Sequence, residues 1–269
     1  MGERVDGRRV RRHDGDVVTE QPDVLAVEEP LEIRLGQEPL TVTMRTPGDD
    51  IDLALGWLVA EGAIRRPSDV VAVRERSQAV PDGLPARSVE IELAAGVAAP
   101  RARAFLTSSA CGVCGTDAIE TIRVRAGDDL HADQCVIDAR VLTRLPDLLR
   151  EQQTAFARSG GLHAAGLFTV DGELLAVRED VGRHNAVDKV VGWALRADRL
   201  PLNGTVLQVS GRASFELAAK SVAAGIPVLS AISAPSTLAV DLARQTGLTL
   251  AGFVRGPSFN LYSGAQRVR

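Results

Sequence analysis

The sequence predicts an α/β protein in which a layered α/β domain follows a smaller α+β subdomain. From about residue 160 onward, short apolar runs alternate with amphipathic helical segments, the pattern of βαβ units and a mostly parallel sheet. The chain has 269 residues, 45% of them hydrophobic, and can therefore bury a sizeable core. The predicted layout is a tail at 1–23, the α+β subdomain at 24–137 and the layered domain at 138–269.

The N-terminal part begins with a charged, Arg-rich and aperiodic stretch, for which we expect a mobile tail over residues 1–23. Alternating residues around a Gly-Gln turn then predict a hairpin over 30–47. Pro47 at the first helical position and the acidic residues that follow it predict a helix start, and the helix continues over 53–64. Two further strands are predicted at 70–75 and 88–94.

The C-terminal part carries the clearest periodicity. Residues 116–124 and 138–160 have helical spacing, the second segment with an interruption at Pro146. Two strands flank an Asp-Gly turn at 171–172. The remaining predicted elements are helices at 184–197, 214–225 and 236–247 and strands at 205–210, 227–233 and 248–255.

Composition excludes several classes of protein. The formal net charge of −4 does not favour a general nucleic-acid binder or a membrane-surface protein. No run approaches the roughly 18 apolar residues of a membrane span, and the N-terminal residues lack the apolar core of a signal peptide. With three cysteines, we expect a cytoplasmic protein in a reducing environment, where structural disulfides are rare.

Three polar motifs follow predicted strands, at Val209–Arg212, Ile232–Ser236 and Phe253–Ser258. In open α/β sheets, ligands bind outside the carboxyl ends of the strands, and helix N-termini there favour anions. Arg212 and Arg255 can add bidentate contacts to phosphate. These motifs predict a phosphate-bearing ligand, although neither a P-loop nor a strand-linked GxGxxG is present.

The motif SSACGVCG at 108–115 places Cys111 and Cys114 in a CxxC pair. His131 and Cys135 have spacings that could complete a zinc site, but the segment between the two pairs has regular helical spacing. A thioredoxin-like couple would precede a helix near the start of a small βαβ domain. A flexible Gly-framed loop that presents a thiolate for sulfur exchange fits the surroundings better.

A zinc deaminase is a further alternative, because His163 resembles the start of its HxE motif. The glutamate that moves the proton is missing, and the CxxC precedes the histidine instead of following it. Deaminase chemistry is therefore disfavoured.

A set of motifs in fixed order resembles the FdhD/NarQ family of formate dehydrogenase accessory sulfurtransferases. The motifs are SSACGVCG, GGLHAAG (160–166), REDVGRHNAVDK (178–189), SGRASFE (210–216) and ISAPSTLA (232–239). The resemblance covers about residues 25–265. It implies a fold similar to that of cytidine deaminases without the zinc chemistry.

The resemblance also implies a mechanism. A cysteine desulfurase would load sulfur as a persulfide on Cys111, and the sulfur would pass to the molybdenum or tungsten of a bis(molybdopterin guanine dinucleotide) cofactor destined for formate dehydrogenase. Family members act as dimers and bind this cofactor as cargo. The residues expected to contact it include Phe253, Val254, Arg255, Gly256, Pro257 and Ser258.

Further roles follow as hypotheses. Arg183 and His184 begin a helix and, with Arg212, could meet phosphate. Cys114 could assist sulfur release, and Glu179 and Asp180 could orient cations or cap the helix. Lys189 and Lys220, the only lysines among 31 basic residues, are expected on helix surfaces. The alternative function is a cofactor-binding chaperone with a structural or zinc-bound CxxC.

Overall fold

The computed structural model describes residues 3–78, 86–100 and 130–269. Its elements, in chain order, are β1 (Val5–Asp14), β2 (Val17–Ala26), β3 (Glu29–Leu35), β4 (Glu38–Arg45), α1 (Asp50–Ala60), β5 (Val70–Gln78), β6 (Ala86–Leu93), α3 (Ala139–Gln152), α4 (Thr154–Ser159), β7 (His163–Thr169), β8 (Leu174–Asp180), α5 (Arg183–Arg196), β9 (Thr205–Val209), α6 (Phe215–Ala223), β10 (Val228–Ala231), α7 (Thr237–Thr246), β11 (Thr249–Arg255) and β12 (Ser258–Ser263). The helix predicted at 116–124 lies outside the described residues.

The C-terminal part is built on a six-stranded sheet of order β12-β11-β10-β9-β7-β8, which confirms the α/β class. Only β9, β10 and β11 pair in parallel. The flanking pairs are antiparallel, so the expectation of a mostly parallel sheet is wrong. Two short hairpin turns explain the difference, because the Asp171–Gly172 and Gly256–Pro257 turns allow only antiparallel neighbours. The predicted likeness to cytidine deaminases stays a prediction.

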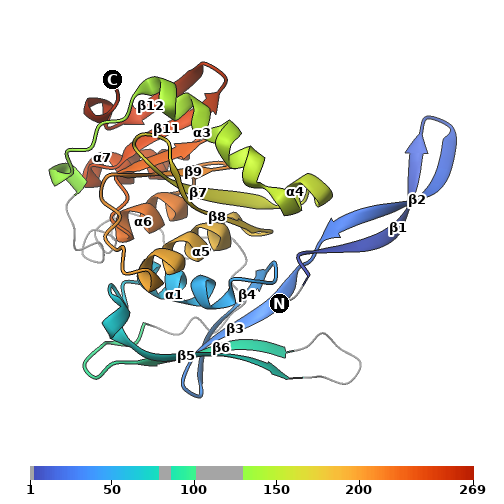
Figure 1. The fold of residues 1–269 in the computed structure, drawn as a ribbon, viewed down its shortest axis with the longest axis horizontal. Helices are drawn as coiled ribbons and strands as arrows, with labels where there is room; N and C mark the ends of the chain where they lie inside the picture. The colour runs from blue at the N-terminus through green and yellow to red at the C-terminus, as the bar shows by residue number, and fades with distance from the viewer. Residues whose placement is uncertain (1–2, 79–85, 101–129) are drawn as a thin grey trace.

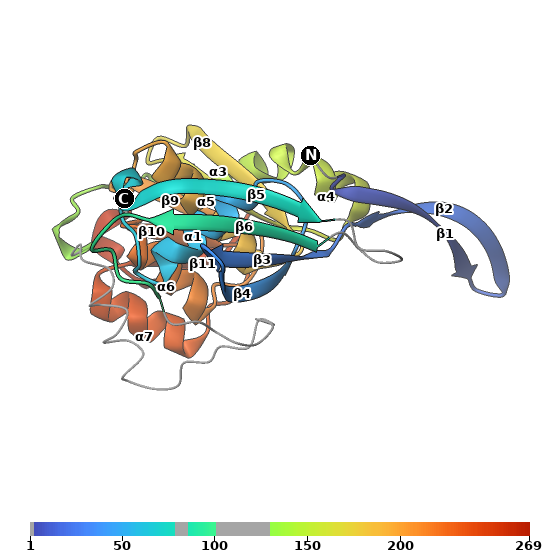
Figure 2. The same ribbon diagram turned by 90° about the horizontal axis from the view of Figure 1, so that it is seen from below.

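The N-terminal part contributes a four-stranded sheet of order β4-β3-β6-β5. Helices α1 and α5 lie between the two sheets, while α3 covers the other face of the six-stranded sheet (Figures 1 and 2). One apolar cluster contains side chains of both sheets and of α1, α5, α6 and α7. The predicted subdomain and the layered domain therefore share one core.

Two helix boundaries differ from the sequence prediction. Helix α1 begins at Asp50, after Pro47, with Asp49 in a left-handed conformation as its N-cap. The segment 138–160 breaks at Gln153 and not at Pro146, which lies inside α3. The reason is tertiary, because the Glu179 carboxylate accepts the first backbone N–H groups of α4 and fixes a second helix start.

No helix within the described ranges is both long and apolar enough to cross a membrane.

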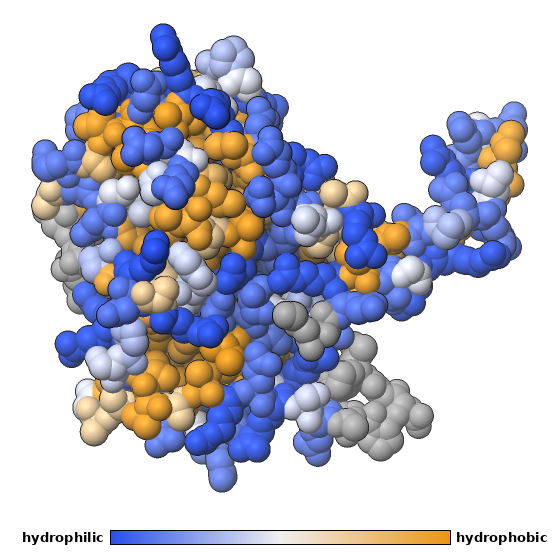
Figure 3. All heavy atoms as spheres, in the orientation of Figure 1, coloured by the Kyte–Doolittle hydropathy of each residue, from blue (hydrophilic) through white to orange (hydrophobic). Residues whose placement is uncertain are grey.

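The sequence predicts an aperiodic, mobile tail over residues 1–23, and the structure shows regular strands there instead. Strands β1 and β2 form an antiparallel hairpin, the arm, which projects from the body (Figure 1). Its base packs on α4 through Val5 and Val24, and most of its other side chains are exposed. Apolar periodicity missed it because few of its residues face a core, although Gly15-Asp16 between the two strands is a hairpin signal. In Figure 3 the arm is largely hydrophilic, with apolar surface near its tip, where Val17 and Val18 are exposed.

The two halves meet where α1 crosses α5. A Cβ on Gly56 of α1 would lie 1.9 Å from the backbone oxygen of Asp188, and a Cβ on Gly192 of α5 would lie 1.8 Å from that of Asp52. Each helix therefore has a glycine where the backbone of the other helix comes closest, and neither position has room for a side chain. This crossing sets the distance between the two sheets.

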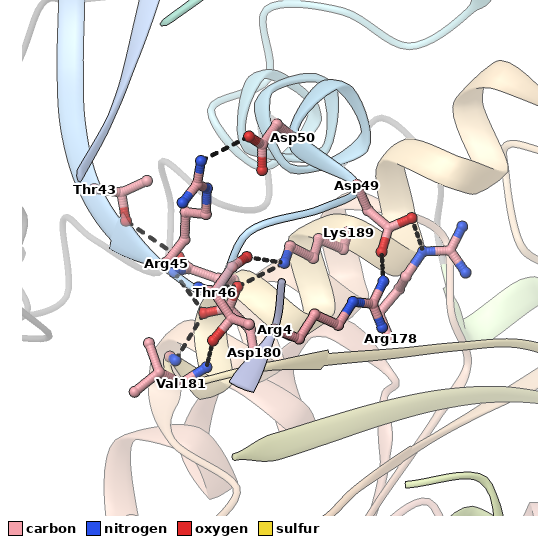
Figure 4. Close-up of polar contacts among 12 residues, drawn as sticks. Arg4, Thr43, Arg45, Thr46, Asp49, Asp50, Arg178, Asp180, Val181 and Lys189 are labelled. Carbon is pink, nitrogen blue, oxygen red and sulfur yellow. Dashed lines mark hydrogen bonds and ion pairs between the residues drawn. The ribbon is translucent and has the colours of Figure 1, made fainter. Parts of the chain in front are cut away.

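A buried polar network fastens the same junction (Figure 4). The ammonium group of Lys189 pairs with Asp180 at 2.7 Å and donates to the backbone oxygen of Thr46 at 2.9 Å. Asp180 also accepts from the backbone N–H of Thr46. Because Lys189 and Asp180 are both fully buried, the expectation of a surface position for Lys189 is wrong.

A second group of charges surrounds the start of α1. Asp49 pairs with Arg4, and Asp52 pairs with Arg178 and Arg196 on the other half of the molecule. Arg45, fully buried, pairs with Asp50 at 2.8 Å. The two pairs of Asp52 tie the N-terminal part to β8 and α5, and the other two stabilise the start of α1 from within the N-terminal part.

We expect Gly56→Ala and Gly192→Ala to lower the free energy of unfolding by about 1–3 kcal/mol or more, since neither backbone can yield without moving a helix. In an open helix the same change would stabilise by roughly 1 kcal/mol. Urea denaturation followed by circular dichroism measures the effect. Gly7→Ala is the control, because nothing lies within 4 Å of a Cβ there. Unchanged stability of both helix variants would contradict the crossing.

Candidate functional site

The three polar motifs after strands β9, β10 and β11 meet at one edge of the six-stranded sheet, as predicted. Ala213 and Pro235 form a parallel bridge, and the N–H of Ser236 donates to the oxygen of Ala213 at 3.1 Å. The N–H of Phe253 donates to the oxygen of Ser233 at 3.2 Å. We call this set of strand ends, with the N-termini of α5, α6 and α7, the carboxyl edge.

The predicted contact segment 253–258 forms the end of β11 and its turn into β12. Phe253 is 39% exposed and has a φ of 54°, which is unusual for an aromatic residue and marks a strained position. The Arg255 guanidinium lies over its ring at 6.0 Å, and its Nε donates to the oxygen of Ile232 at 2.9 Å. Gly256, Pro257 and Ser258 are exposed.

Val254 differs from its neighbours in this segment. Its side chain is fully buried in the core under α3. A side chain buried in this way does not reach a ligand at the carboxyl edge.

Arg183 and His184 begin α5 at the same edge. The loop that positions them is held by Asp180, which accepts the N–H of Gly182 at 2.8 Å and the side-chain amide of Asn185 at 3.0 Å. Asp180 therefore orders the helix start, one of its two predicted roles.

His184 lies between two residues of the next loop. Its Nε2 is 3.2 Å from the Ser214 hydroxyl, and its Nδ1 is 3.5 Å from the Glu216 carboxylate. Burial, above all, lowers the pKa of His184 to about 4. Glu216 raises this pKa, whereas the positive charges of Lys220 and Arg183 lower it further, as does the neighbouring His163. The ring is therefore neutral at neutral pH.

His163 stands at the start of β7, beside Gly211, and not at a helix start as in a deaminase. Its pKa is also lowered, by burial and by the charge of Arg183. The charge of Arg183 thus disfavours protonation of both histidines.

The arginines give the carboxyl edge its capacity for anions. Within the described residues, the Nε of Arg183 is buried without a hydrogen-bond partner. The exposed Arg212 has no ion pair among those same residues. Unpaired guanidinium groups beside helix N-termini favour phosphate or carboxylate. Arg183, Arg212 and Arg255 are thus brought to one edge, as the sequence predicted.

The predicted sulfur-carrying residues Cys111 and Cys114 lie outside the described residues. Of the two further residues of the zinc alternative, Cys135 is half-buried. Burial, above all, and the Asp133 carboxylate raise the pKa of its thiol to about 12.

Sequence reasoning missed the role of Lys220. It pairs with Asp188 at 2.7 Å in the core between α5 and α6, where both are almost completely buried. The carboxylate of Asp188 raises the pKa of the lysine. The expected surface position is therefore wrong. The scarcity of lysine was the one available signal, since arginine replaces it elsewhere in the chain.

The lowered pKa of His184 predicts a pH-dependent stability. In the unfolded chain the ring binds a proton near its ordinary pKa of 6.5, whereas the folded protein binds it only near 4. The unfolded state thus holds more protons between these values, and stability falls as the pH drops. Between pH 7.5 and pH 4.5 the free energy of unfolding falls in both proteins. We expect this fall to be about 1–3 kcal/mol smaller in His184→Asn than in the wild type. Urea titrations at both pH values measure this, and equal losses would contradict the neutral ring.

Comparison with known proteins places this architecture in a family. Residues 26–269 match the model of the FdhD/NarQ family. The sulfur carrier protein FdhD of Nocardia farcinica is 56% identical over 248 residues, which are 92% of this chain and 88% of that protein. The protein of the same name from Mycobacterium tuberculosis is 50% identical over the full length of both.

A solved structure shows the same fold. It comes from Desulfotalea psychrophila and is assigned as a formate dehydrogenase accessory protein, with a TM-score of 0.77 at 20% identity over 99% of this chain and all of that one. The family match begins at the end of the arm and takes in both sheets, the junction and the carboxyl edge. By this match and by its full-length relatives, the chain belongs to the FdhD/NarQ family.

Proposed function

We propose that this protein is a sulfur carrier for the maturation of formate dehydrogenase. It takes sulfur from a cysteine desulfurase as a persulfide on Cys111 and delivers it to the molybdenum or tungsten of a bis(molybdopterin guanine dinucleotide) cofactor, its cargo. The observation that carries the proposal is the full-length identity of about 50% to proteins named sulfur carrier protein FdhD. The name of the Desulfotalea protein supports formate dehydrogenase as the enzyme that receives the cofactor.

The loading step is a thiol–persulfide exchange. The Cys111 thiolate attacks the terminal sulfur of the donor persulfide, a sulfur–sulfur bond forms on Cys111, and the donor cysteine leaves as a thiolate that takes up a proton. No net oxidation occurs, because one persulfide replaces another. Cys114 assists the later release of the sulfur. Its thiolate attacks the Cys111 sulfur of the persulfide, a Cys111–Cys114 disulfide forms and hydrosulfide leaves, and a dithiol reductant then restores both thiols.

The carboxyl edge suits the cargo. The cofactor carries several phosphates. The Arg183 Nε, which has no partner within the described residues, the exposed Arg212 and Arg255, and the helix N-termini of the edge offer donors for them. The exposed Phe253 offers a flat apolar face to a ring of the cofactor. We propose that the protein works as a homodimer, as its family resemblance implies.

Persulfide loading is tested by intact mass after incubation with a cysteine desulfurase and cysteine. We expect an adduct of about +32 Da, one sulfur atom, on the wild type and on Cys114→Ala but not on Cys111→Ala. An adduct on Cys111→Ala alone, or none on the wild type when a control acceptor is loaded, would sink the proposed carrier.

Nucleotide binding is tested with guanosine 5′-diphosphate as a probe for one end of the cofactor. We expect Arg212→Ala to weaken its binding by roughly 10-fold or more, as expected for the loss of a charge-assisted contact. Isothermal titration calorimetry measures the change. Arg144→Ala, an exposed arginine on α3, is the matched control and keeps wild-type affinity. Equal weakening in both variants would indicate a general charge effect and no site at Arg212.

A further inference from the structure

The serine at the N-terminus of α6 does not do what such a serine usually does. Ser214 is the N-cap residue, yet within the described structure its hydroxyl makes no capping hydrogen bond. The equivalent Ser236 accepts the N–H of Ala239 and caps α7. Since an N-cap bond stabilises a helix by about 1 kcal/mol, the orientation of Ser214 needs another explanation.

That explanation is His184, whose Nε2 lies 3.2 Å from the Ser214 hydroxyl. On the other side of the ring, Nδ1 faces the Glu216 carboxylate at 3.5 Å. A carboxylate can only accept, so the Nδ1–H tautomer is favoured, and Nε2 then accepts from the hydroxyl. The order hydroxyl, imidazole, carboxylate is that of an activated nucleophile.

The Glu216 carboxylate is itself positioned by a lysine of the same helix. Lys220, one turn further along α6, lies 3.7 Å from Glu216 and pairs with the buried Asp188 of α5. The three residues thus stand on the ends of two packed helices and not on free loops. Fixed positions of this kind are what a catalytic group requires.

We infer that Ser214, His184 and Glu216 form a nucleophile–base–acid triad at the carboxyl edge, which hydrolyses a carboxylic ester that carries an anionic group. This activity goes beyond sulfur transfer and does not involve the cysteines.

The Ser214 oxygen attacks the ester carbonyl while its proton passes to Nε2 of His184, and a carbon–oxygen bond to the enzyme forms. The carbon–oxygen bond to the leaving alcohol breaks, and that alcohol takes the proton from His184. Water then hydrolyses the acyl-enzyme by the same route. The N–H groups of the first turn of α6, which the Ser214 side chain leaves uncapped within the described structure, are the donors that the triad offers to the developing oxyanion.

Charge around the triad selects the substrate class. Arg183 and the exposed Arg212 stand beside it, and within the described residues the Nε of Arg183 lacks a partner. The groups that act on His184 are Glu216 and Lys220 of α6, Arg183 of α5 and His163 of β7. A bound anion offsets the positive ones and makes His184 a stronger base, so an anionic ester assists its own cleavage.

The test uses a fluorophosphonate probe on the full chain. The nucleophile attacks phosphorus, an oxygen–phosphorus bond forms and fluoride leaves. We expect peptide mapping to find the label on Ser214 in the wild type and none there in Ser214→Ala. His184→Gln slows labelling about 100-fold or more, as loss of a general base does. Glu216→Gln slows it less.

Ser68→Ala is the control, because it removes an exposed serine of the N-terminal part, outside the carboxyl edge, and it is labelled like the wild type. Far-ultraviolet circular dichroism confirms that each variant is folded. An unlabelled Ser214 in the wild type, or labelling of His184→Gln at the wild-type rate, would overturn the triad.

The substrate class is tested with two 4-nitrophenyl esters, the anionic succinate monoester and the neutral butyrate. We expect faster hydrolysis of the monoester and loss of this preference in Arg212→Ala. Equal rates in the wild type would overturn the anionic class. Because neither test contains sulfur or cofactor, their failure is separate from a failure of persulfide loading.

Discussion

The buried carboxylate of Asp180 joins parts of the chain that lie far apart in sequence. It holds the backbone at Thr46, the turn at Gly182 and the ammonium of Lys189 at once. Such a charge is tolerated in the core only because every partner is present, and removal of one partner of a buried pair typically costs 3–5 kcal/mol. The ion pair of Asp180 with Lys189, together with the backbone contacts of Asp180, therefore sets both the path from β4 into α1 and the start of α5.

Helix α5 takes its position from this pair and from the glycine crossing with α1. One face of the helix lies on the six-stranded sheet, while Gly192 allows the backbone of α1 to approach on the other. The result is a helix fixed on two sides, whose first residues are Arg183 and His184. Side chains at the end of a rigid helix hold their geometry better than side chains on a loop.

The carboxyl edge gathers its chemistry for a general reason. Parallel strands followed by helices direct the helix N-termini to one edge, so backbone donors and positive potential accumulate there. Arginines add to this potential and suit an anionic cargo. Burial, above all, keeps His184 neutral, and the positive charges at this edge add to the effect, so the Ser214 hydroxyl meets a neutral imidazole.

The family resemblance, read from motifs such as EDVGRHNAVDK, was correct, and so was the placement of three polar motifs at strand ends. Local patterns carry this information, because turn residues and apolar periodicity act over a few residues. The arm was missed, since strands exposed on both faces show no apolar alternation. Strand β12 was missed for a similar reason, because none of its residues is fully buried.

Local patterns therefore establish the family, most of the elements and the edge at which polar groups collect. The contacts of Lys189, Lys220 and Ser214 follow only from the packing of the whole chain. Helical spacing allowed the lysines a surface position, and it placed Ser214 at the start of a helix without indicating a partner. Their partners Asp180, Asp188 and His184 stand on other elements, and contacts between elements depend on packing, which no local pattern contains.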